Sequence, residues 1–198
     1  SFISLGSATS QCENWVIRNN FFQQLGTNTN SFFSFTKGNT IIQNNLLVLN
    51  NSSGSFTSCT SSLVQDNIFW SNDAALSDVI SDCVGCTFNN NLSYSPTGTL
   101  DPIAGTGNLD NVDPQFITLM NNDAAWDVNN DYTLSGSSPG FTASSDGTQI
   151  GLYGSSHTFV NQGYPVGYPR VHQVTPAVVN VSLGSDVMIN IKAFKAGL

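Results

Sequence analysis

A five-residue corner motif occurs four times in the first hundred residues of this chain, each time as an apolar residue, three polar ones and another apolar residue. The last Asn of each copy follows the previous one after 25, 22 and 24 residues. A period in the low twenties, carried by short β-type segments, is typical of a coiled β-solenoid. Each copy then forms one turn of chain, which buries its apolar face only by stacking on the next turn. The copies are Ile17–Phe21, Ile42–Leu46, Val64–Ile68 and Phe88–Leu92.

The motif alternates in the way expected of strands with one wet face. Three residues before the last Asn the four copies carry an apolar residue, and one residue after it they carry another. A polar residue or Arg lies between them, so the pattern predicts an all-β fold with nearly no helix. The first apolar column is Ile17, Ile42, Val64 and Phe88, and the second is Phe21, Leu46, Ile68 and Leu92.

The repeated Asn has two physical roles to fill. Asn tolerates left-handed backbone angles, and its side-chain amide bonds the backbone across a bend. In turns stacked about 4.8 Å apart, these side chains also bond one another along the column. The repeat therefore predicts an Asn ladder of Asn20, Asn45, Asn67 and Asn91.

Three of the four cysteines share one column, eight residues before the ladder Asn, where the copies carry Cys12, Lys37, Cys59 and Cys83. The strand spacing fits the Cα separation of a disulfide, so a Cys59–Cys83 bridge is one hypothesis, worth about 2–4 kcal/mol. Buried thiols are the alternative. Cys83 and Cys86 also form a Cys-x-x-Cys, but the sequence has neither a second pair for zinc nor a βαβ context for redox chemistry. Cys12 would then remain a thiol or bridge to something outside this chain.

Composition narrows the compartment and the partners. The chain has a net charge of −8 with only 9% charged residues, and five Lys and Arg in 198 residues make nucleic-acid binding a poor expectation. No apolar run approaches membrane-spanning length. Low charge with abundant Asn, Ser and Thr fits an extracellular or cell-surface protein. Because the chain begins almost within a repeat, we expect a processed product, a domain of a longer chain, or a subunit stacked end-on.

The second half carries an ordered set of short motifs between Asn111 and Gly154: Asn-x-Asp-Pro-x-Phe, Asp-Tyr-x-Leu, Gly-Ser-x-Pro and Asp-Gly-x-x-Ile-Gly-x-Tyr-Gly. This set resembles the final coils of bacterial right-handed parallel β-helix proteins of the pectate-lyase-like superfamily, many of them surface or secreted proteins of Bacteroidetes-type bacteria. The resemblance covers about residues 12–154. It implies a right-handed parallel β-helix with an irregular C-terminal cap, but no particular activity, because that superfamily mixes enzymes, adhesins and structural modules.

The domain organisation follows from these segments. We expect coils over residues 1–107, closing coils and cap over 108–154, and an extended linker with a C-terminal β segment over 155–198. Val178–Leu183 and Val187–Phe194 flank a Gly-Ser-Asp turn and predict a hairpin. An isolated hairpin is marginal in water, so it packs within its own chain or pairs with a neighbour through an assembly strand. That strand presents Val187, Ile189, Ile191 and Phe194.

Candidate sites are sparse. A lyase base and hydrolase carboxylates are best sought among Lys37, Asp78 and Asp82, although exposed polar side chains explain this trio equally well. Trp70 and Tyr94, on adjacent turns, could stack sugar rings, or pack under a loop or the C-terminal hairpin. Asp and Asn side chains, whose oxygens are typical Ca²⁺ ligands, recur at short intervals in one loop. They suggest either a Ca²⁺ loop or ordinary turn chemistry at Asp123, Asp127, Asn129 and Asp131.

These observations favour an extracellular structural or adhesive β-helix module that associates with itself or with neighbouring domains of a longer chain, or forms part of a surface fibre, and that contacts polysaccharide. The alternatives are the C-terminal portion of a polysaccharide-degrading lyase or hydrolase, and a calcium-dependent carbohydrate-binding module.

Overall fold

The structure, a computed structural model, describes residues 3–5, 14–24, 31–35, 38–50, 54–57, 59–80, 83–157, 159–160, 169–176 and 189–195. Contacts divide the chain into one unit of residues 1–159 and another of residues 160–198. The described residues hold strands and a single short 3₁₀ helix, η1 (Met120–Asn122). The predicted all-β class is therefore confirmed for the described part of the chain.

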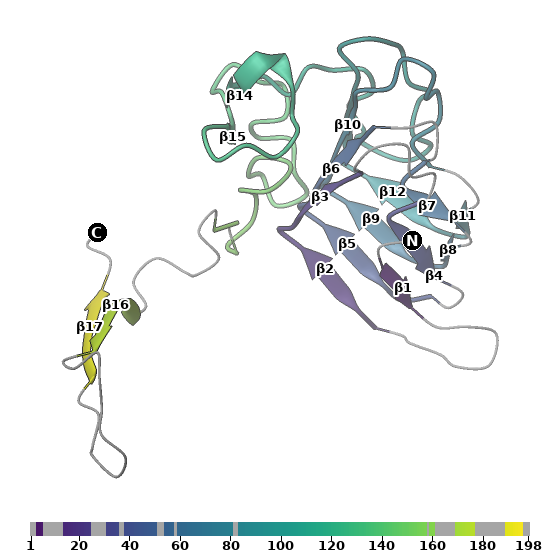
Figure 1. The fold of residues 1–198 in the computed structure, drawn as a ribbon. Coiled ribbons are helices and arrows are strands. Elements are labelled where there is room, and N and C mark those ends of the chain that lie inside the picture. The colour runs from purple at the N-terminus through teal and green to yellow at the C-terminus, as the bar shows by residue number, and fades with distance from the viewer. Residues whose placement is uncertain are drawn as a thin grey trace. The chain divides into compact units, whose positions relative to one another are not determined.

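The stacked turns of the first unit form parallel sheets whose neighbouring strands lie one turn of chain apart (Figure 1). The chain visits the sheets in the same order on each turn, which is a solenoid-like arrangement. One sheet contains β2 (Val16–Arg18), β5 (Ile41–Gln43), β9 (Leu63–Gln65) and β12 (Thr87–Asn89). A second contains β3 (Phe21–Gln23), β6 (Leu46–Leu49), β10 (Ile68–Ser71) and β13 (Leu92–Tyr94). Two shorter sheets contain β1 (Ile3–Leu5), β4 (Phe33–Phe35) and β7 (Phe56–Thr57), and β8 (Cys59–Thr60) and β11 (Cys83–Val84).

The register of these sheets is the one that the repeat predicts. Ile17 lies beside Ile42, Ile42 beside Val64, and Val64 beside Phe88. The next sheet aligns Phe21, Leu46, Ile68 and Leu92 in the same way. The predicted columns are therefore real neighbours along the stack.

At each corner, one residue has the left-handed backbone and the next one forms the side-chain hydrogen bonds between turns, whereas the sequence analysis assigned both roles to one Asn. The residue before each ladder Asn has the left-handed backbone, with φ between 53° and 57° at Asn19, Asn44, Asp66 and Asn90. These residue types adopt that region at low cost because their short polar side chains form local hydrogen bonds. The ladder Asn that follows supplies the contacts between turns.

The Asn ladder runs continuously through the stack. Asn45 donates from its backbone N and from Nδ2 to Oδ1 of Asn67, at 3.0 and 2.9 Å, and the same pair of bonds joins Asn20 to Asn45 and Asn67 to Asn91. Each inner amide also reaches a backbone carbonyl of the previous turn, such as that of Ile17 from Asn45. The ladder thus satisfies buried polar groups that could not otherwise lie inside the coil.

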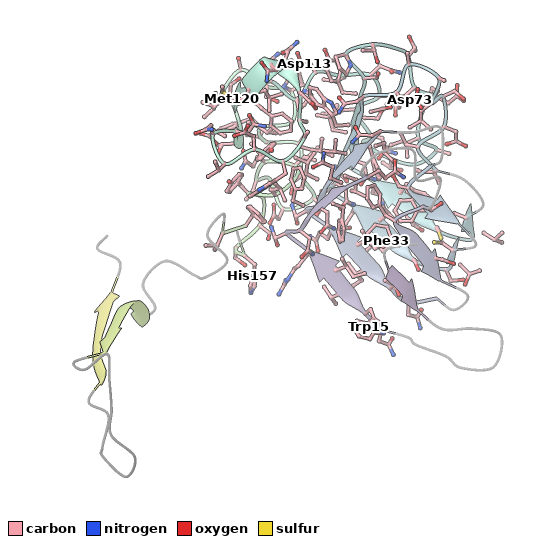
Figure 2. The ribbon with its side chains drawn as sticks, in the orientation of Figure 1. Trp15, Phe33, Asp73, Asp113, Met120 and His157 are labelled. Atoms are coloured by element: carbon pink, nitrogen blue, oxygen red, sulfur yellow. The ribbon has the colours of Figure 1, made fainter. Side chains whose placement is uncertain are left out.

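The interior of the coil is apolar and closely packed. It is filled from all sheets by Ile42, Val64 and Phe69 among others, and Phe33 stacks on Phe56 with ring centroids 5.2 Å apart. Phe33 lies among the stacked strands in Figure 2. This core is what the repeated apolar residues provide by stacking.

The sheet of β3, β6, β10 and β13 is buried on both faces. Leu47 and Phe69 face the interior, whereas Leu46, Ile68 and Leu92 belong to a second core on the other side. Residues between 109 and 159 cover that outer face, among them β14 (Phe116–Thr118), which pairs antiparallel with β15 (Asp131–Leu134). The second apolar column therefore packs outside the coil. The runs Leu46–Leu49 and Ile68–Trp70 are continuously apolar, as expected of strands covered on both sides.

A closing segment, residues 143–154, follows the left-handed corners. Asn90 donates to the Ala143 carbonyl, Ser145 binds Asp66, and Asn19 donates to the carbonyls of Leu152 and Gly154. Its contacts therefore extend from the fourth turn to the first. The motif that implied a C-terminal cap instead runs along the side of the stacked turns.

A shortened turn closes the far end of the stack. Thr106 and Leu109 form parallel bridges with Asn89 and Leu92, and Asn108 Oδ1 accepts from Asn91 as a fifth ladder residue. Gly107, with φ of 71°, takes the left-handed position before it. The amide of Asn108 donates to the carbonyls of Phe88 and Ile103.

The second unit contains an antiparallel pair of strands, β16 (Pro169–Pro176) and β17 (Ile189–Lys195). The sequence predicted a C-terminal antiparallel pair in which Val178–Leu183 is the partner of the last strand. In the structure β17 pairs instead with β16, which lies earlier in the chain. Val178–Leu183 lies outside the described residues. Val187 of the predicted assembly strand also lies outside them. Ile189, Ile191 and Phe194 lie in β17, opposite Pro176, Val174 and Arg170.

Candidate functional site

Three cysteines meet where the third turn packs on the fourth. The parallel pairing of β8 with β11 places Cys83 directly beside Cys59, as the shared sequence column predicted. Cys86 follows in the turn that leads from β11 to β12, where Gly85 has a φ of 67°. This turn brings Cys86 back toward Cys83, and the two thiols are hydrogen-bonded to each other.

A pocket of about 510 Å³ lies beside these thiols. Cys83 and Cys86 line it together with the carboxylates of Asp78 and Asp101. Its apolar lining comes from Ile80, Val84, Phe88 and the loop Pro102–Ala104. The pocket therefore combines sulfur and two exposed carboxylates, and its described lining contains no basic side chain.

The surroundings shift the pKa values of Cys83 and Cys86 in opposite directions. A hydrogen bond from the Cys83 thiol lowers the pKa of Cys86 to about 6, with help from the Ser62 backbone N–H and against the opposing effect of burial. Hydrogen bonds with Cys59 and Cys86, together with burial, raise the pKa of Cys83. Cys86 is therefore the thiol that loses its proton first, and Cys83 is the donor that stabilises the thiolate.

The predicted Cys59–Cys83 disulfide is not formed in this structure. Register alone brings two such residues side by side, but a disulfide also needs a specific torsion between the two sulfurs. Here the Cys83 thiol interacts with both Cys59 and Cys86. Cys12 lies outside the described residues.

Only one member of the predicted catalytic trio can be placed. Asp78 lines the pocket, where its Oδ1 accepts the Ile80 N–H at 2.7 Å. Lys37 and Asp82 lie outside the described residues. The second carboxylate of the pocket, Asp101, was not singled out from the sequence, because it lies in an irregular loop beyond the repeat.

The predicted glycan platform is wrong for Trp70, whose side chain is only 2% exposed. Its ring packs edge-on against Tyr94 at 5.1 Å and close to Phe116 at 5.9 Å, under the residues that cover the outer face of the sheet. The indole N–H donates to Asn72. A sugar ring could therefore not stack on Trp70 without displacing this second core.

The predicted Ca²⁺ loop is a set of turns. Oδ1 of Asp127 accepts from Asn129, and Oδ1 of Asp131 accepts the Thr133 N–H, so both carboxylates bond their own backbone neighbourhood. Asp123 accepts from Asn72 and from the Ala125 N–H. Among the described residues, no group of three or more His, Cys, Asp or Glu side chains converges in a way that could hold a metal ion.

The sequence pattern also missed the buried carboxylate of Asp66. It accepts from the Ser145 N–H at 2.7 Å, from the Ser145 hydroxyl at 2.6 Å and from Gln43 at 3.3 Å. Burial raises its pKa, although the bonds from Ser145 and Gln43 oppose this. The signal available in the sequence was that Asp66 takes the corner position that Asn19, Asn44 and Asn90 take in the other three copies.

No protein-family model, curated protein or solved structure matches this chain. The fold and its pairing define the class as an all-β protein of stacked parallel sheets.

Proposed function

We propose that this chain is a structural module of an extracellular or cell-surface right-handed parallel β-helix, and that it self-associates through its first turn. The parallel pairing between successive turns and the pectate-lyase-like motifs of the second half support the β-helix assignment. Right-handed connection is the rule for parallel strands of one sheet. The low charge and the Asn-, Ser- and Thr-rich composition support a location outside the cell.

The observation that carries the proposal is the edge of the first turn. Among the described residues, β2 pairs only with β5, and β3 only with β6. No described residue donates to Oδ1 of Asn20, although the corresponding oxygen of each later ladder Asn accepts two bonds. Unpaired strand edges are templates for another chain.

Apolar side chains accompany this edge. Trp15 is 48% exposed and Val16 is 53% exposed, and Figure 2 shows Trp15 at the margin of the stacked strands. Ile17 retains 8% exposure, whereas Ile42 and Val64, one and two turns further along, are covered almost completely. A partner that adds a strand here would bury apolar surface as well as pair backbone groups.

We commit to a second copy of this chain as the partner. The shortened turn around Asn108 occupies the other end of the stack, so two copies would meet first turn to first turn. Such a contact makes a closed dimer. Growth into a fibre needs another interface, for which the two-stranded unit of β16 and β17 is the candidate, since a pair of strands is marginally stable on its own.

The test is the monomer–dimer equilibrium of two matched variants. Val16→Lys places a charge on the proposed edge, whereas Val128→Lys places one at a residue that is 74% exposed and lies between β14 and β15. Sedimentation velocity over a concentration series should give a dissociation constant raised at least about tenfold for Val16→Lys and unchanged for Val128→Lys. A monomeric native protein, or equal effects of both substitutions, would overturn the proposal.

In the described part of the chain, no helix is long and apolar enough to cross a membrane.

A further inference from the structure

We propose that Cys83 and Cys86 form a dithiol site that exchanges with small cationic disulfides, with Cys86 as the attacking residue and Cys83 as the resolving one. This inference is independent of self-association, because the site lies between the third and fourth turns. It rests on the pocket, on the turn that joins the two residues, and on the charges around them.

The three thiols differ in how far they are exposed to the pocket. Cys83 and Cys86 are partly exposed and line the pocket of about 510 Å³, whereas Cys59 is 1% exposed and lies against the Phe33 carbonyl. A reagent that enters the pocket therefore meets Cys83 and Cys86 first. Cys59 lies beneath them as the neighbour of Cys83 in the sheet.

Hydrogen bonding decides which thiol attacks. Cys86 accepts from the Cys83 thiol and from the Ser62 backbone N–H, and both bonds stabilise a thiolate. Cys83 supplies the proton of the first of these bonds, so it stays protonated while Cys86 ionises. Dithiol exchange begins with attack by a thiolate and is completed by a second thiol, and Cys86 and Cys83 supply these two groups.

The charge of the pocket selects the substrate class. Asp78 and Asp101 place two exposed carboxylates in the lining, and the lining residues that the structure describes include no Lys, Arg or His. Carboxylates concentrate cations and repel anions at short range, and such steering changes association rates by about 10-fold or more. We therefore infer a preference for disulfides with amino groups over those with carboxyl groups.

The exchange balances in two steps. The Cys86 thiolate attacks one sulfur of the small disulfide, forms a mixed disulfide and releases one small thiolate. The Cys83 sulfur then attacks Cys86 Sγ, expels the second small thiolate and gives it the Cys83 proton. The small disulfide is reduced to two thiols, and the two cysteines are oxidised to a Cys83–Cys86 bond.

The first experiment compares three disulfides on the full chain: cystamine, which is a dication, the neutral hydroxyethyl disulfide, and the dianionic dithiodipropionate. Each rate is divided by the rate with a small model thiol, which removes differences between the leaving groups. We expect a normalised rate at least about 10-fold higher for cystamine than for the dianion. Equal normalised rates, or a preference for the dianion, would refute the cationic substrate class.

The second experiment assigns the residues by peptide mapping after reaction with cystamine. Cys83→Ser should hold a stable mixed disulfide on Cys86, Cys86→Ser should be slow to react, and Cys59→Ser should still form the Cys83–Cys86 bond. Circular dichroism checks that each variant is folded, and the native chain provides the map if one is not. A native product joined through Cys59, or a native mixed disulfide on Cys86 that Cys83 never resolves, would overturn the proposal.

Discussion

Replacing Asn67 by Ala tests whether the ladder stabilises the stack. Asn67 is fully buried, and its Nδ2 donates to the carbonyls of Ile42 and Gln65 and to Oδ1 of Asn91, at 2.8 to 3.0 Å. Its Oδ1 accepts from the backbone N–H and from Nδ2 of Asn45. Ala has no polar side-chain atom, so the substitution breaks all five bonds at once.

The magnitude follows from which groups lose their partner. The buried N–H of Asn45 loses its acceptor, which costs about 1–3 kcal/mol, and each of the other lost bonds contributes about 0.5–1 kcal/mol. Allowing for the bonds that share a hydrogen, we expect Asn67→Ala to lower the free energy of unfolding by about 3–5 kcal/mol. That is a large part of the total of about 5–15 kcal/mol for an ordinary domain.

Asn20→Ala is the matched control at the end of the ladder. Asn20 is exposed, and among the described residues its Nδ2 donates only to the carbonyl of Arg18 and, at 3.2 Å, to Asn45. The Asn20→Ala substitution leaves no buried donor or acceptor without a partner, so we expect it to lower the free energy of unfolding by about 1 kcal/mol. Urea unfolding of both variants measures the difference, and a cost for Asn67→Ala no larger than that for Asn20→Ala would refute the role given to the ladder.

The closing segment provides two further predictions. Burial raises the pKa of Asp66 above its ordinary 3.8, and the charge of Asp146 adds to this, so the proton on Asp66 contributes stability at low pH that is lost as the pH rises through the folded pKa. Asp66→Asn should therefore gain stability relative to the native chain as the pH rises in urea titrations, and a parallel pH dependence of the two would contradict this. Gly151 has a φ of 89°, and a Cβ there would lie 2.5 Å from Ile68 Cδ1, so Gly151→Ala should cost about 1–3 kcal/mol. Gly136→Ala, with no atom within 4 Å of the added Cβ, should be nearly neutral, and equal costs would show that the segment packs differently.

The corner motif predicted the stacking because it stays in register while the loops vary. Strands recur at a fixed offset from the ladder Asn, so alignment on that residue was enough to place Ile42 beside Val64 and Cys59 beside Cys83. The fifth ladder residue, Asn108, was missed since it follows Asn91 after only 17 residues. The shared signal was an Asn followed by Leu in both places.

The covering of the outer face could not be predicted from the repeat. Nothing in a periodic pattern states which distant residues lie on the far side of a strand, so Trp70 suggested a surface platform. Its burial comes from contacts with residues such as Phe116, more than forty positions later in the chain. The thiol site was predicted in part. The sequence showed Cys83 and Cys86 as a Cys-x-x-Cys, but Cys86 lies outside the cysteine column, and the repeat does not predict the left-handed turn at Gly85 that brings it to Cys83.

The unequal lengths of the turns show why the motif is confined to the corners. Successive ladder residues are separated by 25, 22, 24 and 17 residues, yet the same hydrogen bonds join every pair. The ladder holds the turns together along the stack, and the closing segment forms hydrogen bonds with the left-handed corner residues Asn19, Asp66 and Asn90. Because both contacts fall on the corners, length and chemistry can change in the loops at little cost to the coil. The pocket of Cys83 and Cys86 lies in such a region, where Asp101 comes from a loop and Cys86 from a turn. A chemical site can therefore differ from turn to turn while the scaffold that carries it stays the same.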